Sequence, residues 1–276
     1  MLANSLTRSA EKRYLTPFPM YAKLIKRLVV IIAGTYLAVG LFLFFFQNSY
    51  IYFPDSRDFA ACSDFADSDK LNMDGTRAYF KHRSEKLVVF YHGNAGSACD
   101  RAWWKPVFEN LNYSHLFVEY AGYSGDARTP NKKLILQDVE NVNKFLQSRQ
   151  YSRLALMGES IGAAVAVYHS SIADEDQLVL IAPFDSMVNV AKKHYPFFPA
   201  SLLLRENYDT RRWATDLKSV LIVHGERDSI IPLALGRNLF EKIGIADKTF
   251  VAIPGADHND LYDFPETLQV IIRALK

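Results

Sequence analysis

Six short runs of apolar residues recur along the chain from residue 86 onward, and most of them end in glycine or small residues. Apolar runs of this length are typical of strands buried on both faces of a parallel sheet. The predicted strands are residues 86–93, 115–120, 153–158, 177–182, 220–225 and 249–254. An additional antiparallel hairpin is predicted at residues 71–82, where an Asp-Gly pair favours a tight turn.

Segments with helical spacing of apolar residues separate these runs. In residues 131–148, for example, Leu134, Val139 and Val142 form one apolar stripe. The predicted helices are residues 98–111, 131–148, 160–172, 233–244 and 260–275. Strands that alternate with helices predict an α/β fold, with a mostly parallel central sheet and helices on both faces.

One segment interrupts this alternation. Residues 184–214 lie between the fourth and fifth predicted strands and are rich in aromatic residues and prolines. Prolines at this density favour short helices over one long crossover helix. The pattern therefore predicts a short helical cap inserted at residues 184–214.

The chain begins with a basic segment, residues 1–27, followed at 28–46 by an apolar run without a charged residue. A helix of that length spans about 28 Å, close to the thickness of a bilayer's hydrocarbon core. The run is longer than the apolar part of a cleaved signal, and no small-residue cleavage site follows it. We predict an uncleaved transmembrane signal anchor. The basic N-terminus predicts a cytoplasmic start and a catalytic domain on the non-cytoplasmic side, periplasmic or lumenal.

Composition adds limits to this picture. The chain has 276 residues, is 49% apolar, and has a formal net charge of only +2, which is not typical of a nucleic-acid-binding protein. Cys62 and Cys99 are the two cysteines, and they could pair if the globular part faces an oxidising compartment. Nothing in their spacing demands a bond, so we expect two unpaired thiols. Neither a CxxC nor an HExxH pattern occurs, and no metal site is predicted.

Candidate chemistry lies in the loops after the predicted strands, because ligands bind at the carboxyl ends of parallel strands. The stretch GESIG places Ser160 between two glycines at a strand-to-helix junction. Asp228 follows the fifth strand and His258 the sixth. Serine within GxSxG, followed along the chain by an acid and a histidine, is the arrangement of a nucleophile elbow.

The chemistry needs these residue types together. A serine hydroxyl is a poor nucleophile without an adjacent base, and a histidine base needs a carboxylate that fixes its tautomer. Ser160 is therefore the predicted nucleophile, His258 the base and Asp228 the acid. Asp185, after the fourth strand, is the rival acid in a variant arrangement.

Together, the stretches HGNAGS, GESIG, GERDSIIP and GADHNDL resemble α/β-hydrolases. The resemblance covers roughly residues 50–276 and is to the membrane-anchored α/β-hydrolase-domain group, which includes acylglycerol lipases and protein depalmitoylases. It implies the same roles for Ser160, Asp228 and His258. It also implies an oxyanion hole built from the backbone N–H groups of Asn94 and Ile161.

These observations predict a serine hydrolase that cleaves carboxylic esters or thioesters through an acyl-serine intermediate. The expected substrate is an acyl or lipid-like compound, and the reaction needs no cofactor. Two alternatives remain open. The same residues serve amidases and peptidases, and a membrane-tethered binding protein can retain such a fold without turnover.

Overall fold

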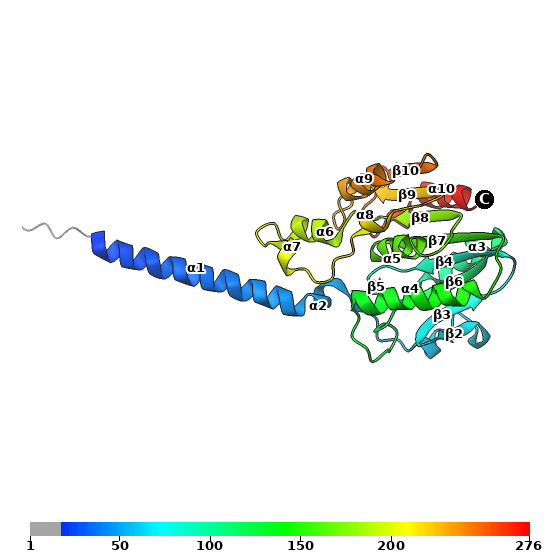
Figure 1. Cartoon of the computed structure of the whole chain (residues 1–276), viewed down its shortest axis with the longest axis horizontal. Coiled ribbons are helices and arrows are strands. Elements are labelled where there is room, and N and C mark those ends of the chain that lie inside the picture. Colours follow the sequence, from blue (N-terminus) through cyan, green and yellow to red (C-terminus); the bar gives the residue numbers. More distant parts are fainter. Residues whose placement is uncertain (1–17) are drawn as a thin grey trace, which may run out of the picture. The chain divides into compact units, whose positions relative to one another are not determined.

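The computed structural model describes residues 18–276 (Figure 1). Side chains are described from Tyr21 onward. A break in the contacts after Leu43 separates a helical segment from a second compact unit, Phe44–Lys276. Part of the basic N-terminal segment, including Arg8, Lys12 and Arg13, lies outside the described residues.

The apolar run predicted as a membrane span lies within one helix, α1 (Phe18–Phe46). Within α1, the stretch Tyr21–Phe46 is long and apolar enough to cross a membrane. The helix begins before residue 28 because lysine and arginine are good helix formers, so Lys23, Lys26 and Arg27 extend it on the N-terminal side.

Eight strands form the central sheet in the order β10-β9-β8-β7-β4-β6-β3-β2 (Figure 1). They are β2 (Lys70–Met73), β3 (Thr76–Lys81), β4 (Lys86–Tyr91), β6 (Ser114–Glu119), β7 (Arg153–Glu159), β8 (Gln177–Ile181), β9 (Val220–Gly225) and β10 (Lys248–Ile253). The six strands predicted from apolar runs pair parallel with one another. At the end of this parallel set, β6 pairs antiparallel with β3, and the hairpin β2–β3 pairs antiparallel around Asp74 and Gly75. The predicted mostly parallel sheet is confirmed.

Both faces of this sheet are buried, as continuous apolar strands require. Along β4, Leu87, Val89 and Tyr91 pack into one core cluster, which includes Val165 of α5, whereas Val88 and Phe90 pack into the other. The helices of the second unit are α2 (Asn48–Ile51), α3 (Lys105–Asn110), α4 (Lys132–Gln147), α5 (Ile161–Ser170), α6 (Met187–His194), α7 (Ala200–Leu203), α8 (Thr210–Trp213), α9 (Leu233–Lys242) and α10 (Pro265–Leu275). Residues of α4, α5 and α9 lie in the first cluster, and residues of α3 and α10 lie in the second.

The region between β8 and β9 contains the three short helices α6, α7 and α8. Pro196 and Pro199 lie between α6 and α7, where they prevent one continuous helix. Short 3₁₀ segments complete the fold: η1 (Phe59–Ala61), η2 (Asp67–Asp69), η3 (Cys99–Trp104) and η4 (Leu261–Asp263). A separate two-stranded ladder joins β1 (Phe53–Pro54) to β5 (Ala95–Gly96) in parallel.

The expectation of two free thiols was wrong. Cys62 and Cys99 form a disulfide, with their Cα atoms 6.0 Å apart. The two cysteines are 37 residues apart, and their spacing gives no sign of the contact. The β1–β5 ladder brings the segment before Cys62 against the loop before Cys99, so the proximity arises from tertiary structure.

Candidate active site

Ser160 occupies the turn between β7 and α5, with φ 55° and ψ −120°. This region of backbone space is strained for a residue with a side chain, and such strain persists only where surrounding structure enforces it. The two flanking glycines allow the turn. A Cβ on Gly158 would lie 2.1 Å from the Gly162 carbonyl oxygen, and one on Gly162 would lie 2.2 Å from that of Tyr91. The helix and strand therefore approach each other more closely than any side chain permits.

The structure brings together the three residues singled out from the sequence. Ser160, Asp228 and His258 follow the carboxyl ends of β7, β9 and β10, which are parallel members of one sheet. The Ser160 Oγ lies 3.2 Å from His258 Nε2. On the other side of the ring, His258 Nδ1 lies 2.7 Å from Asp228 Oδ2. His258 thus bridges the hydroxyl and the carboxylate.

Asp228 is held in its ionised form by several donors. Its Oδ1 accepts hydrogen bonds from the backbone N–H groups of Ile230 and Ile231, at 3.0 and 2.6 Å. A second histidine, His224, places Nε2 3.3 Å from Oδ2. Burial opposes ionisation, but the hydrogen bonds with His224 and His258 hold the pKa of Asp228 well below its usual value.

The rival acid Asp185 is engaged elsewhere. Its Oδ2 accepts a hydrogen bond from Asn189 Nδ2 at 2.8 Å and lies 3.7 Å from the guanidinium of Arg211. These partners belong to α6 and α8, so Asp185 ties the helices of the insert to the end of β8.

The residues proposed for an oxyanion hole lie on the two segments around Ser160. Ile161 is the first residue of α5, so its N–H belongs to the amino-terminal turn of that helix. Asn94 lies in the loop between β4 and β5. This loop runs against the elbow, because a Cβ on Gly93 would lie 3.7 Å from the Cβ of Ser160.

A buried ionic cluster next to Ser160 was not anticipated from the sequence. Glu159 Oε1 lies 2.5 Å from Arg101 Nε and accepts a hydrogen bond from the Gly93 N–H at 3.1 Å. Its Oε2 accepts a hydrogen bond from the Tyr262 hydroxyl at 2.6 Å. Burial opposes ionisation of Glu159, but the charge of Arg101 and these hydrogen bonds hold its pKa below the usual value.

Glu159 thus joins the elbow, the Gly93 loop and the segment after His258. A carboxylate that ends an apolar strand, inside GESIG, is the one sequence signal for this cluster. Arg101 and Tyr262 carry no such signal, because they approach Glu159 from positions 58 and 103 residues away.

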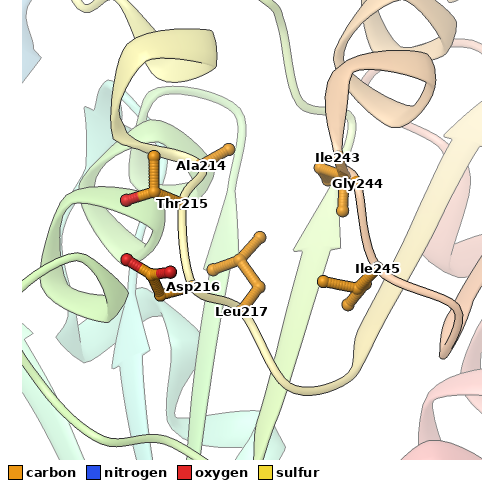
Figure 2. A pocket seen from close by; sticks show the side chains of 7 residues that line it. All are labelled: Ala214, Thr215, Asp216, Leu217, Ile243, Gly244 and Ile245. Atoms are coloured by element: carbon orange, nitrogen blue, oxygen red, sulfur yellow. The ribbon is translucent and has the colours of Figure 1, made fainter.

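A pocket of about 540 Å³ lies near the amino ends of two strands, β9 and β10, away from the carboxyl ends that carry Ser160 and His258 (Figure 2). Its lining comes from residues 214–217, before β9, and residues 243–245, before β10. The segments that precede parallel strands lie at the amino edge, whereas Ser160, Asp228 and His258 follow the strands. This pocket is therefore separate from the serine–histidine–aspartate cluster.

Side chains that could together ligate a metal ion occur around the disulfide. Cys62, Asp64 and Cys99 each place one potential ligand atom within 4.8 Å of the others. The two sulfur atoms are bonded to each other and are not thiolates. While the disulfide is formed, Cys62 and Cys99 cross-link the chain and offer no thiolate ligand to a metal.

Comparison with known proteins agrees with this architecture. A family model described as "Alpha/beta hydrolase domain" matches residues 84–261. The "Uncharacterized protein Rv2307c" of Mycobacterium tuberculosis is 31% identical over 264 residues, covering 90% of this chain and 92% of that protein. The chain is also 26% identical over 220 residues to the lysophosphatidylserine lipase ABHD12 of Bos taurus, covering 68% of this chain and 55% of that protein.

Solved structures show the same fold. A monoacylglycerol lipase from Paleococcus ferrophilus is similar with a TM-score of 0.54 at 17% identity. The similarity covers 72% of this chain and 98% of the lipase.

Proposed function

Because this chain belongs to the α/β-hydrolase family, we propose that it cleaves carboxylic esters or thioesters through an acyl-serine intermediate on Ser160. The observation that carries the proposal is the position of His258, which lies within hydrogen-bond distance of both Ser160 and Asp228. A hydroxyl, an imidazole and a buried carboxylate in this order are the groups that acyl transfer to serine requires.

From these contacts we infer a role for each residue. His258 Nε2 accepts the proton of the Ser160 hydroxyl as Oγ attacks the carbonyl carbon of the substrate. The Asp228 carboxylate accepts a hydrogen bond from Nδ1–H, which fixes the tautomer with a free Nε2 and stabilises the imidazolium ion. The N–H groups of Asn94 and Ile161 bind the oxyanion. His258 then protonates the leaving group, and the same residues activate the water that releases the acid.

We propose acyl or lipid-like esters as the substrates. The family relatives include a protein named lysophosphatidylserine lipase, and the fold is shared with a monoacylglycerol lipase. The insert between β8 and β9 also exposes large apolar side chains, with Phe197 85% and Leu202 80% exposed. Exposed apolar side chains such as these are suited to contact with acyl chains.

We further propose that α1 spans a membrane and that the second compact unit, Phe44–Lys276, which we call the catalytic unit, lies on the non-cytoplasmic side. The basic residues before and within α1 favour a cytoplasmic N-terminus. The Cys62–Cys99 disulfide favours an oxidising compartment for the catalytic unit. Protease added to the non-cytoplasmic side of sealed vesicles should digest that unit. Protection from that side, with digestion from the cytoplasmic side, would show the reverse orientation.

The proposed reaction is tested with Ser160→Ala. This variant should lose hydrolysis by about 10⁶-fold and should no longer react with a fluorophosphonate probe, while its thermal unfolding stays unchanged. A variant that still labels strongly would refute Ser160 as the nucleophile. Comparing the turnover of matched ester and amide substrates distinguishes an esterase from an amidase. A wild-type protein that neither reacts with the probe nor hydrolyses these substrates would be a binding protein.

A further inference from the structure

The residues directly after α1 form an ordered part of the catalytic unit. Gln47 is 6% exposed, and its Oε1 accepts hydrogen bonds from the N–H groups of Arg205 and Glu206, at 2.7 and 3.2 Å. Tyr52 is 3% exposed, and its hydroxyl lies 2.7 Å from Glu206 Oε2. Residues 47–54, which we call the juxtamembrane linker, are thus anchored to the insert between β8 and β9.

The other side of the juxtamembrane linker contacts the Asn94 loop. The N–H of Phe53 donates a hydrogen bond to the Asn94 carbonyl oxygen at 2.9 Å. The Asn94 side chain donates from Nδ2 to the carbonyl oxygen of Ile51 at 3.0 Å. Beyond these contacts, Phe53 and Pro54 pair in parallel with Ala95 and Gly96.

Contacts with other parts of the catalytic unit also hold the Asn94 loop in place. The Gly93 N–H donates to Glu159, and the Gly93 carbonyl oxygen lies 2.7 Å from the buried His92 Nδ1. The Gly93 carbonyl and the Asn94 N–H belong to one planar peptide unit, so fixing the oxygen also fixes the direction of the N–H. The Asn94 carbonyl closes the loop by accepting from Phe53 and from the Tyr123 hydroxyl, the latter at 2.8 Å.

From these contacts we propose that the juxtamembrane linker is a positioning element of the active site. It holds Asn94 in the orientation in which its N–H binds the oxyanion, and so joins the end of α1 to the catalytic geometry. The inference rests on the proposed hydrolysis at Ser160. An oxyanion donor stabilises the transition state effectively when its orientation is fixed in advance. Each such donor contributes about 10²–10³-fold to turnover.

Phe53 offers a substitution that removes one linker contact. Phe53→Pro deletes the N–H that donates to Asn94. Proline is compatible with a short edge strand and with the extended conformation of Tyr52 before it (φ −115°, ψ 127°). Phe53→Ala is the matched control, because it removes the same half-exposed side chain and keeps the N–H.

The measurements use the full-length protein in detergent and a short soluble ester. We expect Phe53→Pro to lower kcat by about tenfold or more relative to Phe53→Ala, with little change in KM. A trifluoromethyl ketone, which forms an oxyanion on the serine, should lose affinity by the same factor. The two variants should share their melting temperature. Equal kcat and equal inhibitor affinity in the two variants would overturn the proposal.

Asn94→Ala decides the question if the proline variant fails to fold. It keeps the backbone N–H and deletes only the side-chain contact with Ile51, and it should lower kcat and inhibitor affinity in parallel by severalfold. Unchanged values would contradict a role for the linker. The proposed hydrolysis is tested separately. It is refuted if the wild-type protein does not bind the ketone or if the Ser160→Ala variant still hydrolyses the ester.

Discussion

Asp228 Oδ2 lies 2.7 Å from Nδ1 of His258 and 3.3 Å from Nε2 of a second histidine, His224. The His224 Nε2 also lies 2.8 Å from the carbonyl oxygen of Ile231, whose own N–H donates to Asp228. The carboxylate is therefore fixed from several directions. A carboxylate held in this way keeps its orientation toward His258 and remains charged when the imidazole takes up a proton.

This arrangement predicts that Asp228, and not Asp185, is the acid. Asp228→Asn should lower kcat by about 10⁴-fold with little change in KM, because the imidazole loses the partner that sets its tautomer. Asp185→Asn is the matched control, and it should stay within about tenfold of wild type, since Asp185 contacts Asn189 and Arg211. Steady-state kinetics on a soluble ester measure both. The reverse pattern would show that Asp185 is the acid.

Glu159 should stabilise the fold through Arg101. Glu159→Gln leaves the largely buried guanidinium of Arg101 without its counter-charge and should lower the free energy of unfolding by about 2–4 kcal/mol. Tyr262→Phe, which removes the hydroxyl that donates to Glu159 and leaves every charge in place, should cost about 1 kcal/mol. Urea denaturation measures both. Equal losses in the two variants would contradict an ionic role for Glu159.

The disulfide should contribute measurably to stability. Cys62 and Cys99 close a loop with a sequence separation of 37, for which the chain-entropy relation gives about 4 kcal/mol. Reduction should therefore lower the melting temperature of the wild-type protein. The Cys62→Ser/Cys99→Ser variant should melt at the lower temperature whether or not reductant is present. A wild-type melting temperature that does not respond to complete reduction would contradict this role.

Glu175 should make stability depend on pH. It is 1% exposed, and burial raises its pKa from 4.5 to about 7. The folded state thus binds this proton more tightly than the unfolded state, so the contribution of Glu175 to stability falls as pH rises from about 4.5 to 7. From pH 4.5 to pH 8, the free energy of unfolding of Glu175→Gln should increase by up to about 3 kcal/mol relative to that of the wild type. A difference between the two proteins that is the same at both pH values would count against the raised pKa.

The exposed apolar residues of the insert should set acyl-chain preference. Each methylene buried against them adds about 0.8 kcal/mol, so kcat/KM for p-nitrophenyl esters below their micelle concentrations should rise well over tenfold from acetate to medium chains. Leu202→Ser should flatten this rise. Ile172→Ser is the control, because Ile172 is an exposed apolar residue in the turn after α5, outside the insert. A maximum at acetate that Leu202→Ser leaves unchanged would point to a small-ester hydrolase.

The sequence by itself determined the strand order along the chain and the position of the strand ends. Apolar runs show where buried strands lie, and parallel strands bring their carboxyl ends to one edge. Ser160, Asp228 and His258 could therefore be placed together, although they are far apart in sequence. The glycines at 158 and 162 could also be interpreted in advance, because only a close approach of helix and strand requires both positions to lack a side chain.

Only the tertiary structure decided which side chains meet across those loops. Hydrophobic periodicity reports which face of an element is buried, but it does not report which polar groups from distant segments become neighbours. The pairing of Cys62 with Cys99, the ion pair of Glu159 with Arg101 and the ladder between the juxtamembrane linker and the Asn94 loop all depend on such contacts. Each requires the full path of the chain, because loop positions follow from the packing of the elements they connect.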